Sequence, residues 1–152
     1  MERIAVTAIL AAIIAGCGSG DDDGMVEEVN CADEPRADTY VANLSKEGEA
    51  GRLEMVLVSS DPAPPAKGDN SWLVEVNDAS GQPVDDATIT LTPFMPDHAH
   101  GTPIDVVVTP ATDGMYDAAP VNLWMPGLWQ VTVDAEADGV EDSAVFSFCI
   151  EG

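Results

Sequence analysis

Hydrophobic and polar residues alternate with a period of two over most of the chain after Gly51. In segment 128–133, aromatic and β-branched residues alternate with polar ones, and segment 88–91 repeats the pattern. Such alternation is typical of a strand that buries one face. The pattern predicts strands at Leu53–Ser59, Ser71–Val76, Ala87–Thr92, Ile104–Val108, Met115–Tyr116, Leu128–Val133 and Ala144–Ile150.

The segments between these strands are rich in the residues that turns require. Proline, glycine and aspartate recur at Asp61–Pro65, Asp78–Gly81, Asp113–Gly114 and Asp138–Gly139. No long segment has helical periodicity, and Thr39–Leu44 is read either as a first edge strand or as a helical turn. The expected fold is an all-β, immunoglobulin-like antiparallel β-sandwich of about seven strands.

One acidic motif resembles the opening of a calcium-binding loop. Asp134–Gly139 has carboxylates at alternate positions and ends in glycine, but such a loop needs a bidentate glutamate at its twelfth position. Val145 stands there, and the flanking segments read as strands. We therefore interpret Asp138–Gly139 as the turn of the last hairpin.

The N-terminus has the pattern of a lipoprotein signal peptide over residues 1–16. The apolar run from Ile4 to Ile14 is shorter than the roughly 20 residues of a spanning helix. It ends in a lipobox, Ile14–Cys17, which predicts lipidation of Cys17 and attachment to a membrane. The alternative is an ordinary secretory signal with a chance cysteine. Gly18 after the cysteine favours the outer membrane, with the protein facing the periplasm.

The mature chain divides into a tether and one domain. Residues 17–30 comprise the lipidated cysteine and an acidic flexible tether, and residues 31–152 form a single β-sandwich domain. Cys31 and Cys149 are an even pair in an exported protein, which predicts a disulfide. The competing interpretation is that these two thiols bind a metal.

Charge and motifs exclude several classes of function. The formal net charge of −23 would repel nucleic acid and anionic lipid headgroups, so nucleic-acid binding is excluded. No serine lies in a G-x-S-x-G turn, and the cysteines are assigned to lipid and disulfide. The sequence therefore predicts a protein that is not an enzyme.

Both histidines of the chain lie in one proline-rich segment, Thr92–Thr102. If Asp97–Gly101 is extended, His98 and His100 project to the same side, where a methionine could add a third donor. The methionine candidates are Met95, Met115 and Met125. Imidazole with thioether suits copper better than magnesium or calcium, and Asp97 is the carboxylate at hand for zinc. The alternative is that the segment is a rigid loop with a structural role.

Three pieces of the sequence together resemble the YtkA-like domain family, which is related in theme to FixH-type proteins. They are a strand-turn-strand unit at Asn77–Ile89, the methionine-proline-histidine segment Pro93–Thr102, and Asp113–Tyr116 followed by Met125–Val133. The resemblance covers about residues 70–148. It implies a sandwich domain outside the cytoplasmic membrane, found as small lipoproteins or joined to metal-efflux and copper-associated modules. Ala99, between the histidines, departs from the glycine of the family pattern.

These observations lead to two hypotheses. The first is a membrane-anchored extracytoplasmic lipoprotein that binds copper through His98, His100, Met95 and Met125. The second is a non-catalytic interaction or scaffold module of the cell envelope, which binds a protein partner and needs no metal or other cofactor.

Overall fold

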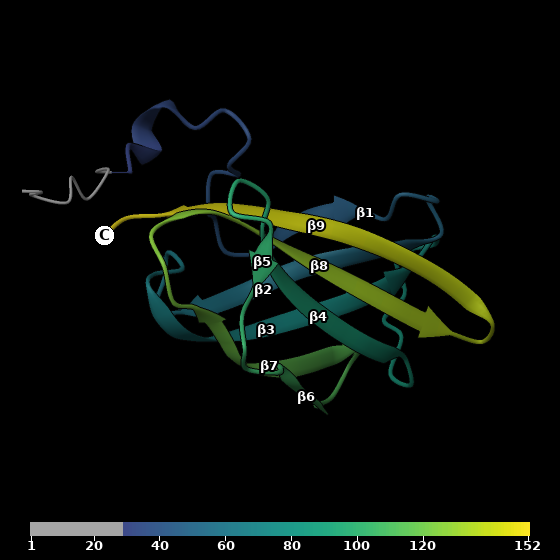
Figure 1. Cartoon of the computed structure of the whole chain (residues 1–152). Coiled ribbons are helices and arrows are strands. Elements are labelled where there is room, and N and C mark those ends of the chain that lie inside the picture. Colours follow the sequence, from purple (N-terminus) through teal and green to yellow (C-terminus); the bar gives the residue numbers. More distant parts are fainter. Residues whose placement is uncertain (1–28) are drawn as a thin grey trace, which may run out of the picture.

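The protein is described by a computed structural model over residues 29–152, and this part folds into two antiparallel sheets (Figure 1). The elements are a short 3-10 helix, η1 (Cys31–Asp33), and the strands β1 (Leu44–Glu47), β2 (Leu53–Asp61), β3 (Gly68–Asp78), β4 (Thr88–Met95), β5 (His100–Gly101), β6 (Val107–Pro110), β7 (Met115–Leu123), β8 (Gly127–Ala137) and β9 (Val140–Ile150). One sheet has the order β1-β2-β3-β7-β6, and the other has the order β5-β4-β8-β9. The expected β-sandwich is confirmed.

Alternation along the strands produces the shared core between the sheets. In β4 the threonines at 88, 90 and 92 are exposed, whereas Ile89 and Leu91 are buried. Trp72 and Trp129 are almost completely buried, and the Trp72 ring meets the rings of Phe146 and Phe148 edge to face. Large buried aromatic rings contribute most of the apolar area that stabilises such a core.

The predicted strand at Met115–Tyr116 was too short, because β7 continues to Leu123. Proline has no backbone N–H and is therefore rare inside strands. Pro120 lies where the register of β3 and β7 shifts, so no hydrogen bond between these two strands is lost there. The predicted strand at Ile104–Val108 is shifted, and β6 begins at Val107. Its register is set by pairing with β7, which a local pattern does not contain.

Two further details concern the ends of the sheets. The ambiguous segment Thr39–Leu44 precedes β1 and overlaps it only at Leu44. Asp138 and Gly139 form the turn between β8 and β9, as expected, and both have positive φ (52° and 75°). That combination is typical of a type I′ hairpin turn.

The Tyr116 hydroxyl fixes the connection between β3 and β4. It donates a hydrogen bond to the carbonyl of Val84 (2.6 Å) and accepts one from the backbone N–H of Ala87 (2.9 Å). Burial raises the pKa of Tyr116, which keeps its hydroxyl protonated as a donor. The connection that precedes β4 is thus attached to the core.

The N-terminal segment of the domain is attached to β9. The expected disulfide between Cys31 and Cys149 is present, with Cα atoms 5.4 Å apart. Asp38 extends this attachment, because its N–H donates to the carbonyl of Ser147 and its carboxylate accepts from the Ser147 N–H, each at 2.7 Å. Within residues 29–152 no helix is long and apolar enough to cross a membrane. The predicted signal peptide 1–16, Cys17 and most of the tether 17–30 lie outside the described residues.

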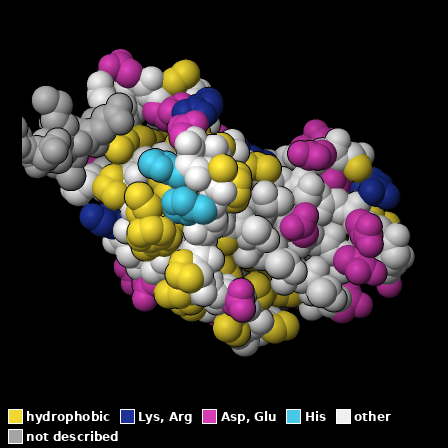
Figure 2. All heavy atoms as spheres, in the orientation of Figure 1, with side chains coloured by type: hydrophobic (Ala, Val, Ile, Leu, Met, Phe, Trp, Pro, Cys, Tyr) yellow, Lys and Arg dark blue, Asp and Glu magenta, His cyan; other side chains and the backbone are white. Residues whose placement is uncertain are grey.

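The surface has two regions of different character (Figure 2). On the face shown, acidic side chains gather at the end that carries the β8–β9 hairpin. The two histidines lie at the opposite end, next to hydrophobic side chains. The histidines therefore lie away from the acidic β8–β9 end.

Candidate functional site

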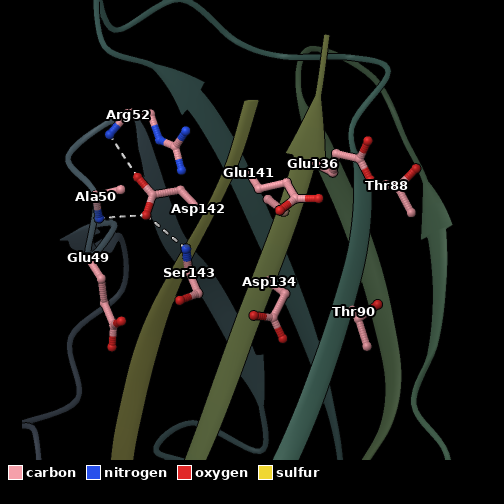
Figure 3. Close-up of a pocket in the computed structure, with 11 residues that line it drawn as sticks. Glu49, Ala50, Arg52, Thr88, Thr90, Asp134, Glu136, Glu141, Asp142 and Ser143 are labelled. Atoms are coloured by element: carbon pink, nitrogen blue, oxygen red, sulfur yellow. Dashed lines mark hydrogen bonds between the residues drawn. The ribbon is translucent and has the colours of Figure 1, made fainter. Parts of the chain in front are cut away.

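The acidic end of the sandwich contains an open concavity between β4, β8, β9 and the β1–β2 connection (Figure 3). Asp142, which borders it, turns its carboxylate toward the backbone N–H groups of Ala50 and Arg52 (2.8 and 2.7 Å). Across residues 29–152, no three His, Cys, Asp or Glu side chains are grouped so that they could hold a metal ion. A pair of histidines beside a methionine is a different donor set, and we place the candidate site at the histidines for that reason.

The histidine segment is a hairpin that ends β4. Met95 pairs with His100 and Phe94 pairs with Gly101, while residues 96–99 form the turn between them. The condition that Asp97–Gly101 is extended is not met, because residues 96–99 form a turn in which Ala99 adopts φ +53°. The tight bend thus forms with alanine in place of glycine, and it leaves the two imidazole rings 5.7 Å apart, centre to centre.

His100 is held by aromatic rings on two sides. Its ring stacks on Trp124 at 5.4 Å and meets Trp129 edge to face at 6.4 Å. Its Nδ1 lies 3.0 Å from the carbonyl oxygen of Gly101. When Nδ1 carries the proton and donates to that carbonyl, Nε2 keeps its lone pair, which is the arrangement that ligating histidines use.

The three candidate methionines lie in different places. Met95 is completely buried and is the cross-strand partner of His100, so the two side chains share one face of the sheet. Met125 is partly buried in the loop that follows Trp124, and its carbonyl accepts a hydrogen bond from Trp129 Nε1 (2.9 Å). Met115 begins β7, at the opposite end of that strand from Leu123 and the Met125 loop. Met115 is therefore not part of the candidate site.

Gly127 allows the Met125 loop to approach Met95. It has φ +129°, and a Cβ placed on it would lie 2.7 Å from the Met95 methyl group. The loop therefore contacts the β4–β5 hairpin at two points, through Trp124 on His100 and through Gly127 on Met95. Two segments that are far apart in the sequence thus meet at His100.

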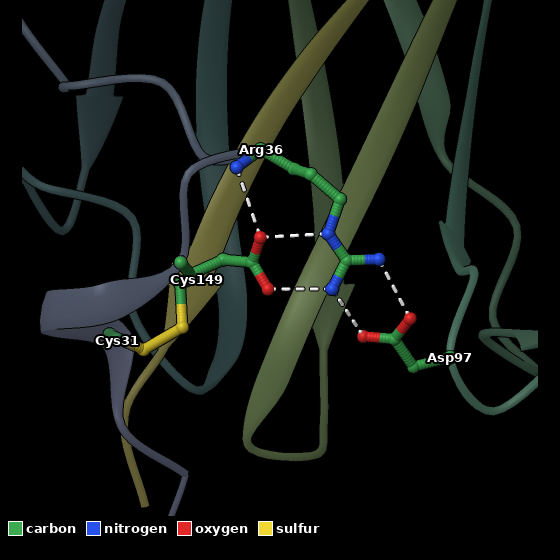
Figure 4. Close-up of polar contacts among 5 residues, drawn as sticks. Cys31, Arg36, Asp97 and Cys149 are labelled. Atoms are coloured by element: carbon green, nitrogen blue, oxygen red, sulfur yellow. Dashed lines mark hydrogen bonds and ion pairs between the residues drawn. A yellow bond between two sulfur atoms is a disulfide. The ribbon is translucent and has the colours of Figure 1, made fainter.

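Asp97, the carboxylate next to His98 in sequence, forms an ion pair with the Arg36 guanidinium (Figure 4). Arg36 Nη1 and Nη2 donate to the two oxygens of Asp97 at 2.8 and 2.7 Å. Its hydrogen bonds with Arg36 lower the pKa of Asp97, and the same pairing raises the pKa of the guanidinium. Both oxygens of Asp97 therefore accept hydrogen bonds from Arg36. The metal-ligand atoms that remain in the loop are imidazole nitrogen and thioether sulfur.

This donor set fits copper. Imidazole nitrogen and thioether sulfur are ligands that copper accepts, whereas magnesium and calcium require several oxygens and zinc prefers a further histidine, cysteine or carboxylate. His98 is exposed in the turn, His100 is partly buried, and Met95 lies on the same face as His100. Copper, when bound, would supply a soft, redox-active ion held by these side chains.

Two residues of this region were not assigned to the candidate site from the sequence. Trp124 lies after the end of β7 and carried no periodic signal, although its neighbours Met125–Gly127 were part of the family pattern. Arg36 lies 61 residues before Asp97, so their pairing has no local signature. With five Lys and Arg against 28 Asp and Glu, Arg36 has many possible acidic partners, and the sequence does not indicate which one it contacts.

The family model described as YtkA-like matches residues 47–134, more than half of the chain. The chain belongs to the YtkA-like family. The resemblance in the sequence covered about residues 70–148. The family match starts earlier along the chain, at residue 47, and ends earlier, at residue 134. It includes the whole histidine hairpin and the Met125 loop, and it supports an extracytoplasmic domain.

Two other comparisons complete the picture of this YtkA-like domain. No curated protein matches the chain. A solved structure of FetP from uropathogenic E. coli strain F11 is similar with a TM-score of 0.43 and 13% sequence identity. The similarity covers 74% of this chain and 92% of the FetP chain.

Proposed function

We propose that the chain is a lipid-anchored lipoprotein of the cell envelope that binds copper, without catalysis, through its methionine-histidine hairpin. The observation that carries the proposal is the pairing of Met95 with His100 across β4 and β5. Directly opposed residues of antiparallel strands have their Cβ atoms about 4.5–5.5 Å apart on one face. A thioether and an imidazole are thereby held near each other, and His98 follows in the same turn.

The surroundings of His100 favour a fixed ligand. The Gly101 carbonyl holds Nδ1, and stacking on Trp124 limits rotation of the ring. A ligand that is already oriented loses less freedom when it binds a metal. We assign His98, His100 and Met95 as the main donors and Met125 as a further thioether from the neighbouring loop.

The proposed location rests on the sequence of the N-terminus and on the disulfide. The pairing of Cys31 with Cys149 suits an oxidising compartment. The lipobox predicts that the full chain fractionates with membranes and that Cys17→Ala releases it into the soluble envelope fraction. Equal release of both proteins would contradict lipid anchoring, and the same fractionation assigns the anchor to the inner or outer membrane.

Metal titration tests the binding site. The full chain, purified in detergent, is titrated with Cu(I) and Cu(II) in competition with a chromophoric chelator, beside the double variant His98→Ala/His100→Ala. We expect the double variant to lose binding while it keeps the circular dichroism spectrum of the native protein. Equal binding by both proteins would refute the proposal.

Exposed hydrophobic side chains among the described residues favour the second candidate, an interaction or scaffold module. Phe94 is 41% exposed, Trp124 43%, Ile104 42% and Val107 63%, values that are high for such residues. In this case a defined envelope protein is recovered by pull-down whether or not chelator is present. The double substitution Phe94→Ser/Val107→Ser should then abolish recovery, and unchanged recovery would count against these two side chains as contacts.

A further inference from the structure

Arg36 is held between two carboxylates next to the histidine hairpin. Its guanidinium donates to both oxygens of Asp97, and on its other side Nε and Nη2 donate to Glu34 at 2.7 and 2.6 Å. The backbone N–H of Arg36 also donates to Glu34, at 3.0 Å. The planar guanidinium fork matches carboxylate geometry, and it cannot be deprotonated in a protein.

The position of Arg36 is fixed from outside the hairpin. Cys31, five residues earlier, is joined to Cys149 at the end of β9, and Asp38, two residues later, is bonded to Ser147. The short segment between these two attachments places Arg36 beside Asp97 (Figure 4). Because the ordering of this segment is provided by the disulfide and β9, the contact with Asp97 needs little additional ordering.

Asp97 is adjacent in sequence to His98 and belongs to the turn that carries both imidazoles. Two histidines and one carboxylate are a common ligand set for Zn(II) in proteins. As they stand in the described residues, these three side chains are not grouped so that they could hold a metal ion, and Asp97 would join the histidines only after release from its present partner. In the structure both oxygens of that carboxylate accept hydrogen bonds from Arg36.

We propose that Arg36 is a specificity-determining residue that selects copper against Zn(II) by occupying the Asp97 carboxylate. This inference rests on the proposed copper-binding function. With Asp97 engaged, the hairpin presents imidazole and thioether, which suit Cu(I), and withholds the oxygen donor that would complete a zinc site. Arg36 touches no metal and acts through Asp97, so it is a positioning residue.

The test compares Zn(II) and Cu(I) affinities in four proteins, each as the full chain in detergent. They are the native protein, Arg36→Gln, Arg36→Lys and the double variant Arg36→Gln/Asp97→Asn. Both side chains of the Arg36–Asp97 pair are about half exposed, and breaking an exposed ion pair typically changes an equilibrium by a factor of about 2–5. We expect Arg36→Gln to bind Zn(II) tighter by a factor in that range and to change little toward Cu(I).

Two variants separate ligation from a general effect of charge. The double variant removes the carboxylate, so its Zn(II) affinity should return to the native value. Arg36→Lys keeps the positive charge but loses the fork that holds both oxygens, so it should lie between the native protein and Arg36→Gln. An equal gain toward Zn(II) and Cu(I) in Arg36→Gln would show simple electrostatic attraction and overturn the proposal.

Failure of this inference is distinct from failure of the proposed function. If the native protein binds no Cu(I), the copper site itself is refuted. If it binds Cu(I) but Arg36→Gln leaves Zn(II) affinity unchanged, the copper site stands and the role of Arg36 is refuted. Circular dichroism and the oxidation state of the disulfide are measured on every variant. They show whether the fold and the attachment of the Arg36 segment to β9 are intact.

Discussion

Asp142 joins the β1–β2 connection to β9, and its replacement should weaken the sandwich in a pH-dependent way. The side chain is only 7% exposed, and its carboxylate accepts hydrogen bonds from four backbone N–H groups. The donors are Ala50 (2.8 Å), Arg52 (2.7 Å), Leu53 (3.1 Å) and Ser143 (2.9 Å). Burial alone would raise the pKa of Asp142, but together these donors favour the charged form and lower it to about 2.

The magnitude follows from the difference between this pKa and the ordinary value of 3.8. One pKa unit corresponds to about 1.4 kcal/mol, and the carboxylate borders an open concavity where water screens it, so we expect about 1–2 kcal/mol. Because the pKa is lower in the folded state, this stability is fully present above pH 3.8 and is lost as the pH falls toward 2. Asn at this position also leaves some of the N–H donors unpaired, which adds about 1 kcal/mol.

Urea denaturation of the native protein and Asp142→Asn at a series of pH values between 7 and 2 measures the effect. We expect the variant to be less stable by about 2–3 kcal/mol at pH 7, with a difference that shrinks below pH 4. Taking the difference removes the titration of the other acidic residues, which both proteins share. Gly48→Ala is a second probe, because its Cβ would collide with the Asp142 carboxyl group. A stability difference that stays constant with pH would refute the reasoning.

Three further substitutions test the attachments of the candidate site. The pair Cys31→Ser/Cys149→Ser opens a loop with a sequence separation of 118 and should lower the free energy of unfolding by about 4–5 kcal/mol, measured in urea; an unchanged midpoint would contradict this. Gly127→Ala puts a Cβ against the Met95 methyl group at an unfavourable φ and should cost about 1–3 kcal/mol in thermal unfolding, whereas an unchanged Tm would show that the loop adapts. Ala99→Gly removes the strain of a positive φ and should stabilise the fold by about 0.5–1 kcal/mol, a prediction that a lower Tm would contradict.

The sequence was sufficient for the strands whose burial alternates. Strands β4 and β8 were predicted because each buries one face. The resulting alternation of hydrophobic and polar residues is visible in the sequence of the strand itself. Only Met115–Tyr116 of strand β7 was predicted, and the rest of the strand follows a register with β3 that contains an irregularity and that only the partner strand reveals. Strand β5 consists of His100 and Gly101, a length at which no periodicity exists. Elements defined by a partner rather than by their own pattern were the ones missed.

The same distinction applies to the candidate site. Its candidate donors were chosen from the sequence because two histidines and a methionine lie close together along the chain and their residue types suit a metal. Their surroundings were not found, because Trp124 and Arg36 reach the hairpin from loops that are distant along the chain. The turn at residues 96–99 was not predicted, because Ala99 adopts a left-handed backbone conformation that alanine seldom adopts.

The structural and metal-binding interpretations of the hairpin differ most at His98. Met95 is completely buried, so its replacement would disturb packing under either interpretation, and His100 is in contact with two tryptophan rings. His98 is exposed, and substitutions at exposed positions usually change stability by less than about 0.5 kcal/mol. If the loop has only a structural role, His98→Ala should leave both the free energy of unfolding and the Cu(I) affinity unchanged. Loss of Cu(I) affinity in that variant, at unchanged stability, can be explained only by a role of the imidazole as a ligand.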